Sequence, residues 1–208
     1  GAADSTPGGF TVELWQAVAQ EMHLKYRFKV RPFDELLQDF RAGRVDVLIN
    51  LAQSAKRSEF ADFSVPNVVA YGAIFTRKSG PRPQNEREAK DHSILVLRGD
   101  LAHDYAMANG YRNLVPVSDV ASAMKLLAAG QHDGMLVSRL AGLMTLKELG
   151  LSGIEPIDEP IRGVVQRFSF AVRKGDSELL ARINEGLALT HASGRTQAIY
   201  EKWFAPLD

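Results

Sequence analysis

Apolar residues in the first half of the chain recur either at the spacing of a helix or in short runs typical of strands. One helical face is predicted from Phe10, Leu14, Ala17, Val18 and Met22. A strand is predicted at 25–30, and Asp34 is a plausible N-cap for a following helix that Gly43 can end. Two short apolar runs, at 45–51 and 71–76, predict buried strands.

The second half continues this alternation of helices and strands. Buried strands are predicted at the apolar runs 94–97, 114–117, 135–137 and 168–172. Helices are predicted at 102–109, from a cap at Ser118 or Asp119 through residue 129, and at 140–149. Asp176 is predicted to cap a long helix through His191, and Gly194 separates that helix from the last one. Such alternation predicts an α/β fold with mainly parallel sheets.

The distribution of polar residues predicts two lobes. A polar stretch at 77–92, with two prolines, indicates a passage from one lobe into another. The strand at 168–172 is expected to bring the chain back. The predicted first lobe is 1–76 with 173–208, and the second is 79–169. The hinge strands are expected near 76–78 and 170–172.

A short repeat supports two similar lobes. Ala-Gly-x-x-Asp occurs at 42–46 and again at 129–133, each time before a buried strand and a polar loop. The polar loops are 53–57 and 138–139. Ligands of open α/β sheets bind outside the carboxyl ends of strands, so both loops are predicted to contact a ligand. Each copy alone is also explained as a common helix-to-strand joint.

Composition narrows the classes of function. The 208 residues carry 25 Lys+Arg and 25 Asp+Glu, so the zero formal charge gives no drive toward nucleic acid. Cysteine is absent, and the 5 histidines show no metal-ligand spacing, so neither a cofactor nor a metal is expected. The chain begins with Gly1 rather than Met, and we expect it to be trimmed from a longer, exported protein.

Several segments, taken in their order and spacing, resemble the motifs of one family. Residues 9–14 read Gly-Phe-Thr-Val-Glu-Leu, similar to a family motif Gly-Phe-x-x-Asp-Leu. The other matching segments are 43–47, 54–57 followed by 63–66, 170–176 and 199–204. The chain thereby resembles the type II periplasmic solute-binding proteins, extracellular solute-binding family 3. This group includes polar amino-acid receptors and the sensor modules of membrane histidine kinases.

The resemblance implies a two-lobed Venus-flytrap fold that closes on a ligand between its lobes. It implies that Arg57 grips a ligand carboxylate or other oxyanion, because a guanidinium meets such groups bidentately. The alternative is a structural ion pair with Glu59 or Asp62. Ser54 and Gln53 offer neutral donors beside Arg57, although Ser54 could serve only the turn.

The second lobe contributes candidates of its own. The turn at Gly99 and Asp100 precedes a helix, and the family uses this turn for a ligand carboxylate. Asp100 could instead cap the helix and occupy its N–H groups. Ser138 and Arg139 follow the repeat strand, and Arg139 could clamp an anion or point into solvent. Gln166 could contact the ligand or be an ordinary hinge residue.

The sequence departs from the family at two places. Residues 1–8 cannot supply the strand and aromatic loop with which the family normally begins. Amino-acid receptors of the family carry an Asp for the ligand's ammonium where this chain has Ser138. We therefore expect a preference for anionic ligands without an essential α-ammonium group, unless another carboxylate such as Asp100 takes that role.

Three functions follow from the resemblance. The first is a periplasmic, membrane-tethered sensor module that works in cis with a membrane signalling domain. The second is the binding protein of an ABC importer, which works in trans with a permease. The third, an enzyme like the cyclohexadienyl dehydratases, is disfavoured because Asp100 is the single carboxylate in the predicted ligand loops. We expect a binding protein rather than an enzyme.

Overall fold

The computed structural model describes residues 9–204. The predicted absence of an initial strand concerns residues 1–8 and lies outside this range. The described chain forms two compact units. The first unit comprises 9–31, 35–68 and 167–204, and the second comprises 32–34 and 69–166. The hinges predicted near 76–78 and 170–172 lie on or beside the strands β3 and β8, and their placement stays a prediction.

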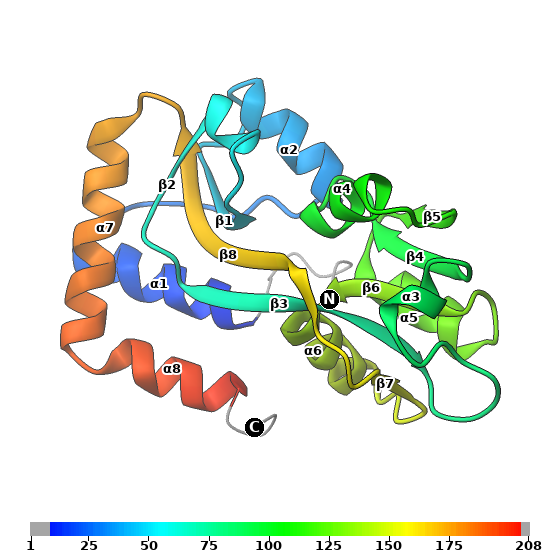
Figure 1. Cartoon of the computed structure of the whole chain (residues 1–208). Helices are drawn as coiled ribbons and strands as arrows, with labels where there is room; N and C mark the ends of the chain where they lie inside the picture. Colours follow the sequence, from blue (N-terminus) through cyan, green and yellow to red (C-terminus); the bar gives the residue numbers. More distant parts are fainter. Residues whose placement is uncertain (1–8, 205–208) are drawn as a thin grey trace. The chain divides into compact units, whose positions relative to one another are not determined.

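Most helices of the first unit come from the two ends of the chain (Figure 1). Its elements are α1 (Phe10–Met22), α2 (Phe33–Arg41), β1 (Val47–Ala52), η1 (Arg57–Glu59), β2 (Ala61–Phe63), the end of β8 (Ile161–Arg173), α7 (Ser177–Ala192) and α8 (Arg195–Phe204). α1 and α7 pack along each other, as the predicted amphipathic face of α1 requires. Gly186 of α7 allows this approach, because a Cβ there would lie 2.7 Å from Val18 Cγ1.

The second unit is built around a sheet with helices on it. Its elements are β3 (Val68–Arg77) from Val69 onward, α3 (Glu86–Ala89), β4 (Ser93–Leu97), α4 (Leu101–Ala108), β5 (Asn113–Val117), α5 (Val120–Ala128), β6 (Gly134–Ser138), α6 (Arg139–Leu149), β7 (Ile154–Pro156) and the first part of β8. Strand order is β8-β3-β6-β4-β5, with β7 paired to β3. The buried residues form two clusters, one that includes Ile94 and Leu136 and one that includes Leu95 and Met135. Successive side chains of β4 and of β6 therefore belong to different clusters, because they point to opposite faces of the sheet.

The predicted α/β class is confirmed, but the sheet is mixed rather than mainly parallel. β4 runs parallel to β5 and β6, as expected for strands joined by helices. β3 runs antiparallel to β6 and β7, and β8 runs antiparallel to β1 and β2. β3 and β8 are the strands on which the chain passes between the units, so they lack the helical crossover that makes a parallel pair.

The strand predicted at 25–30 is wrong. This segment belongs to neither a helix nor a strand, and its side chains Tyr26 and Val30 are exposed. Its alternating pattern resembles that of a strand, but a strand also requires a hydrogen-bonded neighbour, and none pairs with it in residues 9–204. α2 also begins at Phe33, so Asp34 lies inside the helix instead of capping it.

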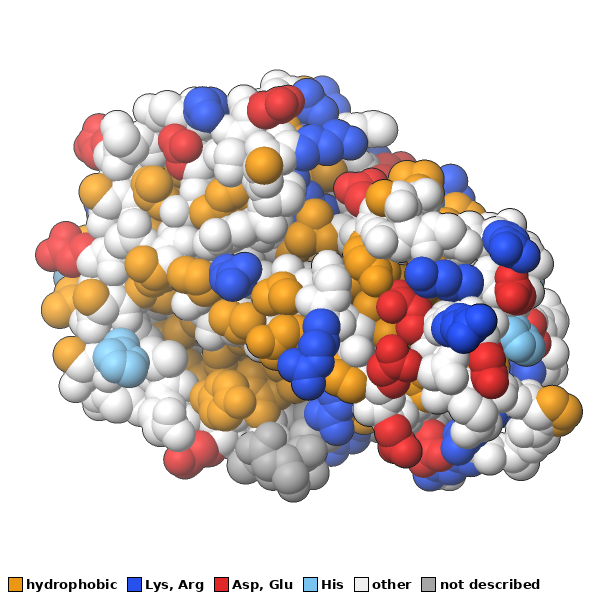
Figure 2. Space-filling model, in the orientation of Figure 1, with side chains coloured by type: hydrophobic (Ala, Val, Ile, Leu, Met, Phe, Trp, Pro, Cys, Tyr) orange, Lys and Arg blue, Asp and Glu red, His pale blue; other side chains and the backbone are white. Residues whose placement is uncertain are grey.

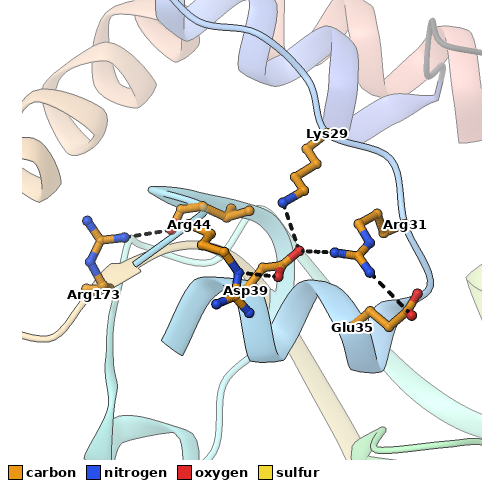
Figure 3. A network of polar contacts seen from close by, with 7 residues as sticks. Lys29, Arg31, Glu35, Asp39, Arg44 and Arg173 are labelled. Carbon is orange, nitrogen blue, oxygen red and sulfur yellow. Dashed lines mark hydrogen bonds and ion pairs between the residues drawn. The ribbon is translucent and has the colours of Figure 1, made fainter. Parts of the chain in front are cut away.

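A buried carboxylate fixes part of this irregular segment to α2 (Figure 3). Asp39 is 2% exposed and accepts from Arg44 Nε at 2.8 Å and Arg31 Nη1 at 2.9 Å. Lys29 Nζ lies 3.0 Å from the same carboxylate, and Glu35 pairs with Arg31 at 3.3 Å. The hydrogen bonds from Arg44 and Lys29 lower the pKa of Asp39 from 3.8 to about 2. Three cations on one carboxylate thus hold residues 29–31 against α2.

Candidate functional site

Arg57 is buried at the start of the short helix η1, directly after β1. Its backbone N–H donates to Ser54 Oγ at 3.0 Å, and its Nη1 donates to Ala52 O at 2.8 Å. Arg57 as a whole residue is 5% exposed, and the hydrogen bond to Ala52 O orients its guanidinium at the end of β1. Asp62, one of the ion-pair partners considered from the sequence, accepts from the Gly175 N–H at 2.8 Å.

Gln53 joins the loop after β1 to β8. Its Nε2 donates to Ser169 Oγ at 2.7 Å and to Ser64 O at 3.3 Å, and its backbone N–H donates to Arg167 O. Ser54 Oγ serves the turn that places Arg57. The structure therefore gives Gln53 and Ser54 supporting contacts within the first unit. Contact of either side chain with a ligand stays a prediction.

Ser138 ends β6 and is the N-cap of α6. Its Oγ accepts from the Ala141 N–H at 3.3 Å, and the residue is 2% exposed. Arg139 is the first residue of α6, and its side chain is exposed to solvent. Position 138 thus presents a neutral, partly engaged hydroxyl, and the role of Arg139 as an anion clamp stays a prediction.

The turn at Gly99 and Asp100 is built for a sharp change of direction. Gly99 has φ +81°, a conformation that favours glycine, and Asp100 is the N-cap residue of α4. The Asp100 side chain makes no capping hydrogen bond. Its carboxylate instead accepts from Gln166 Nε2 at 3.2 Å (Oδ1) and 3.1 Å (Oδ2). The Asp100 side chain therefore does not cap the N–H groups of α4, which one reading of the sequence expected it to do.

Strand register brings the second-unit candidates to one edge of the sheet. Val96 of β4 lies opposite Leu136 of β6, and the two strands are parallel. The turn after β4 and Ser138 after β6 therefore lie at the same edge, the carboxyl edge at which ligands of α/β sheets bind. The antiparallel strand β3 begins at that edge, where Gly72 lies opposite Ser138.

Gln166 is fully buried in β8, with 0% exposure. Its Oε1 has no hydrogen-bond partner within the described part of the chain. Sequence reasoning considered Gln166 a ligand contact or a hinge residue and missed its pairing with Asp100. No local signal in the sequence could have revealed it, because the two residues are 66 positions apart.

The rest of the molecule is described by its candidate metal ligands, the length and hydropathy of its helices, and its surface charge. Between residues 9 and 204, no group of three or more His, Cys, Asp or Glu side chains could hold a metal ion. Over the same range, no helix is both long and apolar enough to cross a membrane. Acidic and basic side chains are interspersed on the face shown in Figure 2, without a field of one sign. Recognition of a charged ligand must therefore depend on a few placed groups.

Comparison with known proteins places these features in a family. L-cystine-binding protein TcyA of Bacillus subtilis is 26% identical over 198 residues, covering 94% of this chain and 72% of that protein. A solved histidine kinase sensor domain with similarity to periplasmic binding proteins is 34% identical, with a TM-score of 0.89. It covers 96% of this chain and 87% of the other. An ancestral arginine-binding protein bound to arginine is 27% identical, with a TM-score of 0.85, over 94% of this chain and 88% of the other.

The similarity to these proteins confirms the two-lobed periplasmic-binding-protein fold. The relatives are named for binding, which supports the expectation of a binding protein rather than an enzyme. The family model for bacterial extracellular solute-binding proteins, family 3, matches residues 2–206. The chain belongs to family 3 of the bacterial extracellular solute-binding proteins.

Proposed function

We propose that this chain is the solute-sensing module of a membrane signalling protein and that it binds a small carboxylate-bearing ligand. The observation that carries the sensor role is the similarity to the histidine kinase sensor domain, at 34% identity over 96% of the chain. For comparison, the probable amino-acid ABC transporter-binding protein of Haemophilus influenzae is 26% identical over 94% of the chain. In this role the module lies outside the cytoplasm and is tethered to the membrane.

In the first unit, Arg57 is the residue proposed to bind the carboxylate group of the ligand. Its guanidinium is buried and oriented by the Ala52 carbonyl oxygen, and its backbone N–H is bonded to Ser54. An oriented guanidinium loses little entropy when it meets a carboxylate, and the contact has two parallel hydrogen bonds. In the second unit, we propose that the turn at Gly99 and the residues Ser138 and Arg139 complete the ligand shell.

Signalling in this proposal requires that the ligand bind one conformation better than another. A ligand shifts a two-state equilibrium only by its differential affinity for the two states. Closure of the two lobes on the solute is the proposed state change, with β3 and β8 as the connecting strands.

The second candidate is the solute receptor of an ABC importer, which several relatives' names favour. The coding sequence beyond residue 208 distinguishes the two. A membrane-spanning helix followed by a kinase or cyclase domain is the expected result. A stop codon shortly after residue 208 would contradict the sensor role and support the importer.

The sensor role is also testable in a signalling readout. The chain replaces the sensor domain of a histidine kinase that controls a reporter gene, and amino acids and their carboxylate analogues are added outside the cell. Reporter output is expected to change with a solute that also raises the melting temperature of the purified chain. A solute that stabilises the purified chain but leaves the output unchanged would count against the sensor role.

A further inference from the structure

Resting on the proposed function, we propose that Gln53 is a positioning residue that holds Arg57 in the orientation that binds a ligand carboxylate. The half-buried side chain of Gln53 donates through Nε2 to Ser169 Oγ at 2.7 Å and to Ser64 O at 3.3 Å. Ser64 and Ser169 are 2% and 0% exposed, and these residues all belong to the first unit. Gln53 therefore has no amide N–H left for a ligand, and it acts through Arg57.

The contact with Ser64 fixes which end of the Gln53 amide faces β8. A backbone carbonyl oxygen only accepts hydrogen bonds, so the amide nitrogen must face Ser64 O, and Oε1 in its place would be repelled. Ser64 is itself tied to β8, because its N–H donates to Phe170 O at 2.9 Å and its Oγ accepts from the Phe170 N–H at 3.0 Å. The side chain of Gln53 is thus clamped to a buried part of the first unit.

The peptide group between Ala52 and Gln53 connects this clamp to Arg57. Its N–H, which belongs to Gln53, donates to Arg167 O of β8 at 2.9 Å. Its carbonyl oxygen, which belongs to Ala52, accepts from Arg57 Nη1 at 2.8 Å. A trans peptide group is planar, and its N–H and C=O point in opposite directions. One rigid plane therefore joins the backbone of β8 to the guanidinium of Arg57.

Gln53 lies where the sheet can no longer hold this plane by itself. On one side of the plane, Ala52 is the last residue of β1 and pairs with Phe168 of β8. On the other side the turn begins, and Ser54 Oγ accepts from the Arg57 N–H at 3.0 Å. Without the clamp on Gln53, the plane would rotate more freely and Ala52 O would move. The guanidinium would then sample more orientations, which weakens a contact that depends on two parallel hydrogen bonds.

A matched pair of variants separates positioning from a general loss of stability. Gln53→Met keeps about the same volume and removes both N–H donors. Thr190→Val also keeps its shape, and it removes the buried hydrogen bond of 2.7 Å from Thr190 Oγ1 to Gly186 O in α7 of the same unit. Both variants lose buried hydrogen bonds and are expected to unfold at lower temperature. Gln53→Met alone is expected to disturb Arg57.

The first measurement follows the Arg57 side chain in the chain without added solute. Nuclear magnetic resonance of the arginine Nε–Hε groups gives the heteronuclear Overhauser effect, which reports fast motion. The Arg57 signal is the one that is missing in Arg57→Lys. Wild type and Thr190→Val are expected to show an ordered Arg57, and Gln53→Met an Arg57 as mobile as the exposed Arg27. Equal order of Arg57 in wild type and Gln53→Met would overturn the proposal, as would a mobile Arg57 in wild type.

The second measurement is calorimetric titration with L-cystine, L-arginine, L-glutamine and L-histidine, each of which carries a carboxylate. Gln53→Met is expected to weaken the tightest of these interactions by about tenfold or more, and Thr190→Val by less than about twofold. Equal affinity of wild type and Gln53→Met would overturn the positioning role and leave the proposed function intact. If none of these solutes binds wild type, the proposed function is contradicted, and the order of Arg57 alone decides whether Gln53 positions it.

Circular dichroism shows whether each variant folds. If Gln53→Met does not fold, Ser169→Ala takes its place in both measurements, because it removes the contact of 2.7 Å and leaves Gln53 bonded to Ser64 O. The expected changes in Arg57 order and in affinity then have the same direction and a smaller size. A folded Ser169→Ala in which neither quantity changes would overturn the proposal.

Discussion

Arg44 donates through Nε to Asp39 Oδ1 at 2.8 Å, although Arg44 is largely exposed and Asp39 is buried. Lys29 and Arg31 approach the other oxygen of the same carboxylate, at 3.0 and 2.9 Å. The carboxylate is thus surrounded by cations from both sides. Its charge, more than its shape, holds the segment before α2 in place (Figure 3).

The lowered pKa of Asp39, about 2 in the folded chain, predicts a pH-dependent contribution to stability. A carboxyl whose pKa is lower when folded than when unfolded stabilises the fold above its unfolded pKa of roughly 4. That contribution is lost as the pH falls through the folded pKa. Asp39→Asn should therefore be less stable than wild type at pH 7, and the difference should shrink between pH 4 and pH 2.

Urea unfolding at several pH values measures this effect. Glu35→Gln is the control, because that carboxylate pairs with Arg31 at the surface, at 3.3 Å and with 44% side-chain exposure. Surface pairs of this kind contribute roughly 0–1 kcal/mol. A stability difference between Asp39→Asn and wild type that does not change with pH would contradict the electrostatic account.

Gly142 of α6 packs against the ring of Phe75 of β3. A Cβ at position 142 would lie 2.2 Å from Phe75 Cζ, and Phe75 is fully buried, so the ring has little room to move. Gly142→Ala should destabilise the chain by about 1–3 kcal/mol through overpacking, despite the better helix propensity of Ala. Chemical denaturation measures the difference. Gly153→Ala is the matched control, because nothing lies within 4 Å of its Cβ, and equal losses in the two variants would disprove the packing argument.

Tyr105 and Tyr111 both donate to the carboxylate of Glu86. The Tyr111 hydroxyl lies 2.7 Å from Oε2, and the Tyr105 hydroxyl lies 2.9 Å from the same atom. Burial and the neighbouring carboxylate raise the pKa of Tyr105 to about 12, and that of Tyr111 is raised further. Tyr111→Phe should cost about 0.5–3 kcal/mol, because a hydrogen bond to a charged group is lost.

The same pair predicts a spectroscopic signature. Alkaline titration followed by tyrosinate absorbance should show a step near pH 12 that Tyr105→Phe removes. Titration of Tyr105 near its ordinary value of roughly 10 would contradict the burial and contact with Glu86.

Local features of the fold were predictable from the sequence, because their cause is local. The sequence predicts a helix cap at Ser118 or Asp119 and another at Asp176. In the structure, Asp119 and Asp176 are the caps, and each accepts from the N–H three residues on, Ser122 and Leu179. Most strands that were predicted from short apolar runs are also present, at β1, β3, β4, β5 and β6. These patterns depend on residues that are close in the chain.

Features that depend on distant partners were not predictable. The segment at 25–30 has the alternation of a strand but no strand beside it among the described residues. β8 begins at Ile161, well before the apolar run at 168–172, and it also pairs with β3, a strand far away in the chain. In the candidate site, Gln166 was named from its place in the chain. Its contact with Asp100 depends on a turn 66 residues away.

The most direct test of the central claim is calorimetric titration of wild type and Arg57→Ala with the tightest-binding carboxylate found in a thermal-shift screen. Arg27→Ala, an exposed arginine of the same unit, is the control. Binding should be weakened by about 2–5 kcal/mol in Arg57→Ala, because the buried guanidinium is proposed to bind the carboxylate of the ligand. Binding should be unchanged in Arg27→Ala. Equal affinity of wild type and a folded Arg57→Ala would contradict the account.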